Sequence, residues 1–299
     1  MIMTKPSEVH GRTEGNGLAL GAVVFTVLAW ASAFVAIRGL GDDFGPGPLT
    51  LGRLGVAVVV LGAMLAVRRN WVRPNRREWT LLLVYGVVWF GVYNVALNAS
   101  EQRIDAGTAA MLVNIGPILI ALLAGTLLNE GYPRWLLAGA GVAFAGAALI
   151  GVATAGEDDA DLLGIALGVV AAVAYAIGVV AQKPVLRRLP VLQVTWLGCT
   201  IAAVACLPYA PALAEEVGRA SAGALGGLLY LGLVPTALAF STWGYALARM
   251  DAGRLGVTTY LVPPLAVVLA WVLLEEVPAP LALAGGVVCL AGVALSRRR

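Results

Sequence analysis

The chain has 299 residues, of which 60% are hydrophobic and 12% are charged, with a formal net charge of +3. A soluble domain usually carries about 25% charged and about 45–50% apolar residues. No soluble fold of this length could bury so much apolar surface, which excludes the soluble classes and predicts an all-α integral membrane protein.

A polar tail, residues 1–17, precedes the first apolar run. That run is about 20 residues long, whereas the core of a signal peptide has about 7–15 apolar residues. We therefore expect a retained first span rather than a cleaved leader.

Ten apolar runs approach the length of about 20 residues that a spanning helix needs. The short connections between them are rich in Gly and Pro and hold nearly all of the charge. Beyond the last run, residues 296–299 form a basic tail. The ten predicted spans are 18–38, 48–67, 79–98, 106–128, 135–154, 162–182, 191–210, 225–246, 255–274 and 279–295.

The distribution of charge orients these spans, because Lys and Arg favour cytoplasmic loops. A cytoplasmic N-terminus puts 16 of the 20 basic residues inside and the acidic stretch 157–161 outside. An odd number of spans would place the basic C-terminal tail on the wrong side. We therefore expect ten spans with both termini in the cytoplasm.

The chain repeats itself at an offset of 146 residues. Residues 103–149 align without a gap with residues 249–295, so that R-I-D-A-G-T meets R-M-D-A-G-R. Each half, 18–154 and 162–295, holds five spans, and an odd number makes the second half enter the membrane from the opposite side. Inverted-topology repeats of this kind are typical of secondary transporters that work by alternating access.

The repeated D-A-G stretch precedes spans four and nine. Asp105 and Asp251 stand where they can cap the first N–H groups of those helices. Gly107 and Gly253 allow close helix approach. Direct contact with substrate is the alternative for these residues.

The chain resembles the drug/metabolite transporter superfamily, and within it the EamA-type proteins and the YddG-like amino-acid exporters. The likeness rests on W-A-S-A-F-V-A-I-R in the first span, on the repeated D-A-G, and on L-V-N-I-G-P-I-L-I-A-L-L-A-G-T-L-L-N-E with its counterpart L-V-P-P-L-A-V-V-L-A-W-V-L-L-E-E. The resemblance implies ten helices, eight of them around a central cavity, and a bacterial inner membrane. It says little about the substrate.

Several activities are excluded. The only histidine, His10, lies in the polar tail, and no P-loop motif is present, so we expect no catalytic residues, no metal site and no cofactor. We expect no nucleic-acid partner. The three cysteines lie in apolar runs and are interpreted as small buried hydrophobes.

No Asp or Glu falls near the centre of any predicted span. Proton-coupled exporters commonly use an intramembrane carboxylate. This pattern favours transport driven by the substrate's own gradient, although other groups can relay protons.

Aromatic, amide and hydroxyl side chains fall within the predicted spans, most of them near mid-depth. Buried amides need partners, which a substrate cavity or helix–helix hydrogen bonds would supply. Lipid-facing packing is the alternative for the tryptophans. The candidates are Trp30, Trp89, Asn94, Asn98, Asn114, Tyr175, Thr236, Ser241 and Tyr260.

Pro117 interrupts span four, and Pro263 and Pro264 interrupt span nine at the matching place. Broken helices at matching positions point to a binding site, with simple kinking as the alternative. Arg53 is the one basic residue clearly inside a span. It either binds a carboxylate in the cavity or extends to the lipid headgroups.

These patterns predict a secondary transporter that exports a small-molecule substrate, with amino acids as the first choice. A drug or organic-cation exporter of the same fold is the main alternative, because aromatic linings attract cations. A lipid flippase or an intramembrane enzyme is a weaker one. The sequence does not indicate the oligomeric state.

Overall fold

The computed structural model describes residues 7–41, 43–103, 112–154, 161–274 and 279–298. Every regular element within these residues is helical, in agreement with the all-α class that the composition predicts. Asp105 to Gly107 of the first D-A-G stretch and Glu276 lie outside the described residues.

The first half of the chain contains a π-helical segment, η1, inside the third apolar run. Its elements in chain order are α1 (Ser7–Arg38), α2 (Pro46–Arg68), α3 (Arg76–Val84), η1 (Tyr85–Tyr93), α4 (Asn94–Glu101), α6 (Gly116–Leu127) and α7 (Arg134–Thr154).

The second half contains a π-helical segment, η3, and two short 3-10 helices, η2 and η4. Its elements are α8 (Leu162–Val185), α9 (Val191–Ala205), η2 (Leu207–Tyr209), α10 (Ala210–Arg219), α11 (Ala222–Leu231), η3 (Gly232–Leu238), α12 (Ala239–Leu247), α13 (Ala252–Thr258), η4 (Thr259–Leu261), α14 (Val262–Leu274) and α15 (Pro280–Ser296).

Seven helices are long and apolar enough to cross a bilayer, so the chain is a multi-pass membrane protein. The bent pair α9 and α10 adds an eighth if it is counted as one span, and α6 and α15 are shorter apolar helices. Helix α1 already begins at Ser7, ahead of the apolar run that starts at residue 18.

Local sequence signals set several helix starts. Pro46 occupies the first turn of α2, where a missing N–H costs nothing. Asn75 and Glu78 form a reciprocal capping box at the start of α3, with bonds of 2.9 and 2.7 Å. The Asp161 carboxylate accepts the N–H of Leu163 and so caps α8.

The predicted span over residues 191–210 is broken by a bend. Helix α9 ends at Ala205, and the chain bends by 56° before α10. Pro208 and Pro211 lack N–H groups and stand in the first turns of the elements that follow, so they begin new helices instead of continuing α9. The 15 residues of α9 rise only about 22 Å.

The π-helical segments leave carbonyl oxygens available to side chains. Asn94 Nδ2 donates to Phe90 O at 2.9 Å and to Trp89 O at 3.3 Å in η1. Thr236 Oγ1 donates to Leu231 O, five residues earlier, at 2.7 Å in η3. Wide turns of this kind are frequent at functional sites.

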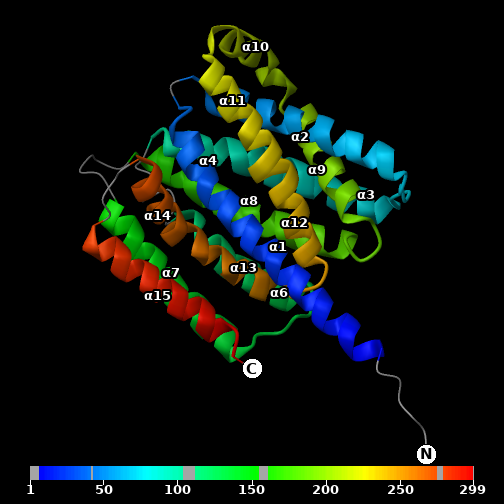
Figure 1. Cartoon of the computed structure of the whole chain (residues 1–299), viewed down its shortest axis with the longest axis vertical. Helices are drawn as coiled ribbons and strands as arrows, with labels where there is room; N and C mark the ends of the chain where they lie inside the picture. The colour runs from blue at the N-terminus through cyan, green and yellow to red at the C-terminus, as the bar shows by residue number, and fades with distance from the viewer. Residues whose placement is uncertain (1–6, 42, 104–111, 155–160, 275–278, 299) are drawn as a thin grey trace, which may run out of the picture.

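Helices of the two halves interleave. Helix α1 packs against α12 and α14, and α2 packs against α9 and η3. Helices α7 and α15 lie side by side at one flank of the molecule (Figure 1). Their contact is close because glycines line it: a Cβ on Gly139 would meet Ser296 N at 2.4 Å, and one on Gly146 would meet Cys289 N at 2.5 Å.

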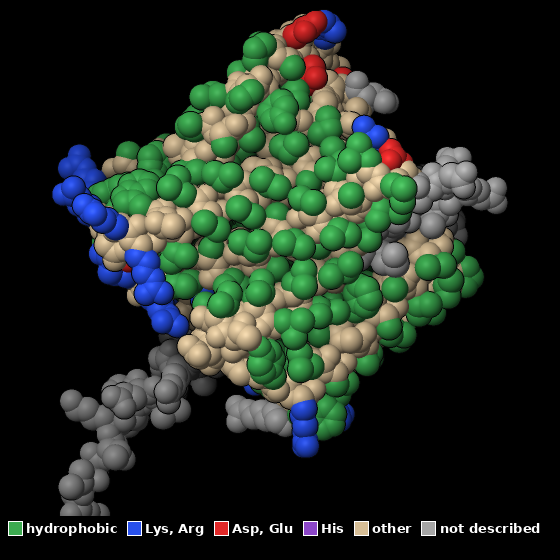
Figure 2. All heavy atoms as spheres, turned by 180° about the vertical axis from the view of Figure 1, so that it is seen from behind, with side chains coloured by type: hydrophobic (Ala, Val, Ile, Leu, Met, Phe, Trp, Pro, Cys, Tyr) green, Lys and Arg blue, Asp and Glu red, His purple; other side chains and the backbone are tan. Residues whose placement is uncertain are grey.

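Charged side chains gather at two ends of the bundle. Figure 2 shows a broad face covered by hydrophobic side chains, with Lys and Arg along one edge and Asp and Glu near the opposite one. We call the end with Phe44, Glu101 and Asp161 the Phe44 end. We call the end with Lys183 and Arg188 the Lys183 end. An apolar belt between two charged ends is what a bilayer requires.

Candidate substrate cavity

A cavity of about 610 Å³ lies among α1, α2, η1, α4, α6, α7, α8 and α14. It reaches from the middle of the bundle to the Phe44 end, where its lining includes the exposed residues Gly41, Gln102 and Ala279. The cavity therefore opens at the Phe44 end. Of the residues predicted for the site, those that line it are Trp30, Arg53, Trp89, Asn94, Asn98, Asn114, Pro117, Tyr175 and Pro263.

Aromatic rings fill the bundle at the inner limit of the cavity. Trp89 contacts Tyr175 and Phe240 with ring centroids 5.3 and 5.1 Å apart, and Trp30 contacts Trp243 at 5.1 Å. Tyr85 and Phe90 pack behind them. This cluster separates the cavity from the Lys183 end and gives it an apolar floor.

The amides of the cavity wall are held by helix–helix and local bonds. Asn98 Nδ2 donates to Pro46 O at 3.3 Å and to Thr50 Oγ1 at 3.2 Å, which ties α4 to α2. Asn114 lies at the break before α6, and its main-chain carbonyl accepts a hydrogen bond from the hydroxyl of Tyr260 at 2.8 Å. Both interpretations of the amides, cavity lining and helix–helix bonding, therefore apply to Asn98.

Arg53 is only 5% exposed and lines the cavity from α2. Its Nε donates to Thr236 Oγ1 of η3 at 3.0 Å. The guanidinium thus points into the protein and not outward to lipid headgroups. Among the described residues of the lining, Arg53 is the one cation.

The predicted prolines coincide with helix breaks. Pro117 follows a turn at residues 114–115 and is the second residue of α6, and Pro263 follows the 3-10 turn η4. Both line the cavity. Pro264 instead faces α15, because a Cβ on Gly286 would lie 3.2 Å from it.

Three predicted residues lie behind the cavity wall. Thr236 is 1% exposed and supports Arg53. Ser241 of α12 donates to Ala237 O, four residues earlier at the end of η3, at 2.7 Å. Tyr260 is fully buried against Asn114. None of the three is among the described lining residues.

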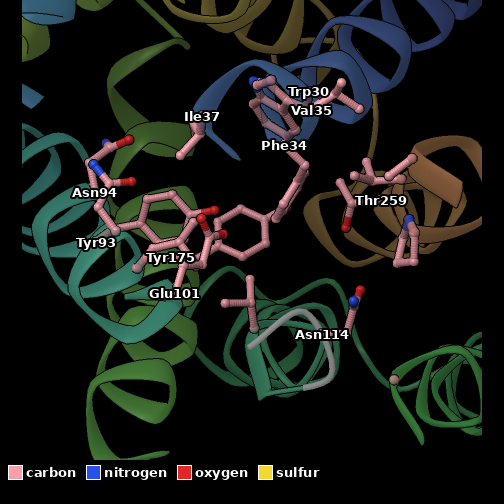
Figure 3. Close-up of a pocket in the computed structure, with 18 of the residues that line it drawn as sticks. Trp30, Phe34, Val35, Ile37, Tyr93, Asn94, Glu101, Asn114, Tyr175 and Thr259 are labelled. Carbon is pink, nitrogen blue, oxygen red and sulfur yellow. The ribbon is translucent and has the colours of Figure 1, made fainter. Parts of the chain in front are cut away.

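Several lining residues escaped the sequence prediction, because depth along a span does not reveal which face turns inward. They include Phe34, Tyr93, Phe240 and Thr259. Glu101 at the end of α4 is the one carboxylate among the described lining residues, and Figure 3 shows it beside Tyr93 and Tyr175. It lies at the end of α4, in keeping with the expectation that no carboxylate falls near the centre of a span.

The Lys183 end is closed by a polar network. Glu130, just after α6, accepts the N–H groups of Ala252 and Gly253 at 2.8 and 3.1 Å at the start of α13. Lys183 of α8 lies 3.7 Å from the same carboxylate and donates to Met250 O. One carboxylate thus joins three segments.

This network corrects the predicted role of Asp251. Asp251 is the N-cap residue of α13, but its side chain makes no capping bond. Glu130 satisfies the free N–H groups instead, and Asp251 pairs with Arg254 at 3.7 Å. Gly253 allows the close approach that the sequence indicated, since a Cβ there would lie 3.3 Å from the Cα of Ala121.

No group of three or more His, Cys, Asp or Glu side chains that could hold a metal occurs in the described ranges. The three cysteines are buried free thiols. The cavity wall offers one guanidinium, the Glu101 carboxylate, amides, hydroxyls and aromatic rings.

Two relatives of the chain carry names that describe export or efflux. The chain is 40% identical over 281 residues to a probable terminal-alkyne amino-acid exporter of Streptantibioticus cattleyicolor, covering 94% of each chain. It is 28% identical to a probable amino-acid metabolite efflux pump of Salmonella typhimurium, covering 90% of this chain and 91% of that one.

The fold also matches a solved structure. A crystal structure of a protein with 22% identity superposes with a TM-score of 0.78 over 93% of this chain and 96% of the other. The family model described as the EamA-like transporter family matches twice, at residues 17–152 and 162–298. Because these two matches cover nearly the whole sequence, the chain belongs to the EamA-like transporter family.

Proposed function

We propose that the chain exports amino acids across the bacterial inner membrane by alternating access. The observation that carries this proposal is a cavity open at one end and closed at the other. Its wall holds aromatic rings, neutral amides and a single guanidinium, with one carboxylate, Glu101, at the end of α4. Such a lining suits small zwitterions with apolar side chains. The names of the two relatives point to the same substrate class.

Alternating access implies inverted repeats, and reciprocal contacts support that arrangement. Gly86 of η1 packs against α9, where a Cβ on it would lie 2.9 Å from Gly198 O. Gly232 follows Gly86 by 146 residues, and a Cβ on it would lie at the same distance, 2.9 Å, from Arg53 O of α2. Arg53 in turn precedes Gly198 by 145 residues. Each contact is therefore the repeat image of the other.

Two further contacts join a residue to its own repeat counterpart. Tyr260 donates to the carbonyl of Asn114, and Cys289 Sγ to the carbonyl of Ala143, both across a separation of 146 residues. A residue can meet its counterpart only near a two-fold axis between the repeats. These bonds support an in-plane pseudo-two-fold axis through the α7–α15 side of the bundle.

We infer ten spans with both termini in the cytoplasm. Seven long apolar helices, the bent pair α9–α10 and the shorter apolar helices α6 and α15 support this number. The Lys183 end would then face the cytoplasm and the Phe44 end the outside. The proposed boundaries are a cytoplasmic tail over 1–17, repeats over 18–154 and 162–295, and a basic tail over 296–299.

Export driven by the substrate gradient alone remains part of the proposal. Glu101 is the one carboxylate among the described lining residues, and it lies at the end of α4 and not at mid-depth. A strict dependence of transport on a proton gradient in liposomes would contradict this part. An organic-cation exporter is the second candidate, favoured by the aromatic floor of the cavity.

Counterflow in proteoliposomes tests the function directly. Vesicles loaded with an unlabelled amino acid, without proton or sodium gradients, should take up the labelled amino acid, and Trp30→Ala should reduce this exchange. If no member of a broad amino-acid panel exchanges while organic cations do, the second candidate replaces the first. The absence of both would contradict small-solute transport.

A further inference from the structure

We propose, building on amino-acid export as the function, that Arg53 and Asn98 form a head-group site for a zwitterionic α-amino acid. In this site the Arg53 guanidinium binds the α-carboxylate and Asn98 Oδ1 accepts an N–H from the α-ammonium. The substrate side chain then extends over the aromatic residues Trp30 and Tyr175.

Asn98 presents a fixed acceptor. Its Nδ2 donates to Pro46 O at 3.3 Å and to Thr50 Oγ1 at 3.2 Å. The Pro46 carbonyl can only accept, so the amide nitrogen must face it and Oδ1 must face away. Asn98 is 4% exposed, and its Oδ1 has no hydrogen-bond partner among the described residues. A buried acceptor of this kind requires a donor.

Arg53 presents fixed donors. The bond from Nε to Thr236 Oγ1 holds the guanidinium in one orientation. Among the described residues, Thr236 is the one hydrogen-bond partner of the Arg53 guanidinium. The two Nη atoms therefore remain for a ligand. A carboxylate commonly binds a guanidinium through two parallel N–H groups. Because Arg53 is buried, water screens this attraction little.

The two groups stand side by side on one wall. Asn98 is bonded to Thr50, and Thr50 and Arg53 are three residues apart on α2, where side chains are neighbours at about 5–6 Å between Cβ atoms. Arg53 and Asn98 both line the same cavity. This spacing suits an ammonium and a carboxylate attached to one α-carbon.

The far side of the cavity supplies room and a further polar group for the substrate side chain. The Tyr175 hydroxyl is buried and makes no hydrogen bond with any described residue. Trp30 and Phe34 of α1 lie across from it (Figure 3). Apolar or aromatic side chains that carry at most one polar atom fit this surface.

The pair discriminates against substrates with only one charge. A cation without a carboxylate would place a second positive charge near the buried Arg53 and would offer its guanidinium no acceptor. An anion without an ammonium would have no N–H donor for the Asn98 oxygen, which would stay without a hydrogen bond. A zwitterion satisfies both groups at once.

Competition in the counterflow assay tests the site on the wild type. The probes are the labelled amino acid that exchanges fastest, its own unlabelled form, its amide and its N-acetyl derivative. The intact amino acid should compete about tenfold or more better than either derivative, because each derivative loses one charged hydrogen bond. Equal competition by both derivatives would overturn the head-group site.

Two variants assign the charges to residues. Arg53→Gln should abolish the preference over the amide while the preference over the N-acetyl form remains, and Asn98→Leu should do the reverse. Ser241→Ala, which removes a hydroxyl that bonds Ala237 O away from the cavity, should keep both preferences. Retention of both preferences in the two site variants would overturn the assignment.

The outcomes separate the two proposals. If wild type exchanges no amino acid, the proposed function fails. If it exchanges amino acids without distinguishing the derivatives, only the head-group site fails. A variant that unfolds in detergent leaves the decision to the wild-type comparison, which needs no substitution.

Discussion

At the scale of single residues, the bond between Arg53 and Thr236 holds the cavity's guanidinium in place. Thr236→Val preserves side-chain volume but removes the acceptor. We expect the substrate concentration for half-maximal counterflow to rise about threefold to tenfold. A hydrogen bond to a charged group contributes about 1.5–3 kcal/mol. The rise stays below the full loss because the bound substrate itself partly holds the guanidinium in place.

Ser241→Ala is the matched control for this change. It removes a hydroxyl from the neighbouring helix without touching the cavity, so its half-maximal concentration should stay near that of wild type. An unchanged value in Thr236→Val as well would mean that Arg53 needs no support from η3.

Asp161 gives a prediction for pH. The ion pair with Arg103 at 2.7 Å, and then the bond from Leu163 N, lower the pKa of the Asp161 carboxyl below its ordinary value. A group with a lowered folded pKa stabilises the protein above its unfolded pKa, which is about 3.9 for Asp, and loses this effect as pH falls through the folded pKa.

Asp161→Asn isolates the charge, because asparagine can still cap α8. The variant should melt at a lower temperature than wild type near neutral pH, and the two Tm values should converge below the pKa of Asp161. Measurement of Tm against pH in detergent checks this. A gap that persists in acid would attribute the difference to capping geometry.

The residue types of the site could be read from the sequence, but their directions could not. Asn94, Asn98 and Trp89 were found because polar and large aromatic groups are unusual at depth in a span. Phe240 and Glu101 were missed, since an apolar ring in an apolar helix carries no signal and a carboxylate at a span end looks exposed. The inward face depends on packing between the two halves.

At the scale of helices, the α7–α15 contact depends on glycine. A Cβ on Gly146 would lie 2.5 Å from Cys289 N and 2.6 Å from Gly285 O, and backbone atoms cannot move aside. Gly146→Ala should therefore destabilise the fold by about 1–3 kcal/mol, as other overpacking changes do. The measurement is Tm in detergent.

Gly141 of the same helix is the control. A Cβ built there meets nothing within 4 Å, so Gly141→Ala should leave Tm unchanged or raise it slightly through better helix propensity. Similar effects of the two substitutions would show that the helix–helix contact contributes little.

Sequence periodicity predicted where apolar helices lie but not where they bend. Most spans agree with the helices to within a few residues, because the apolar run itself defines the buried length. The predicted span 191–210 runs across the break after Ala205, because Pro208 lies within an otherwise apolar run. The π-helical segments were missed too, since one extra residue per turn leaves composition unchanged.

At the scale of the whole molecule, the closed Lys183 end depends on Glu130, which joins the segment after α6 to α8 and α13. Because this one carboxylate connects three segments at the Lys183 end, we expect Glu130 to hold the cavity in its state open at the Phe44 end. Glu130→Ala removes the charged acceptor of two N–H groups, a loss of about 1.5–3 kcal/mol per charged hydrogen bond.

Thiol labelling measures the opening that should result. Gln182 is fully buried beneath the cluster and bonds Tyr85, so a Gln182→Cys reporter in a background without Cys199, Cys206 and Cys289 is shielded while this end stays closed. In that background Glu130→Ala should raise the labelling rate about tenfold or more. Glu216→Ala removes a similar carboxylate bond, to Gly45 N at the Phe44 end, and should leave the rate unchanged. Equal rates with and without Glu130 would show that the aromatic rings alone close the path. The free energy of closure would then lie in ring packing, and the polar network would serve only to cap α13.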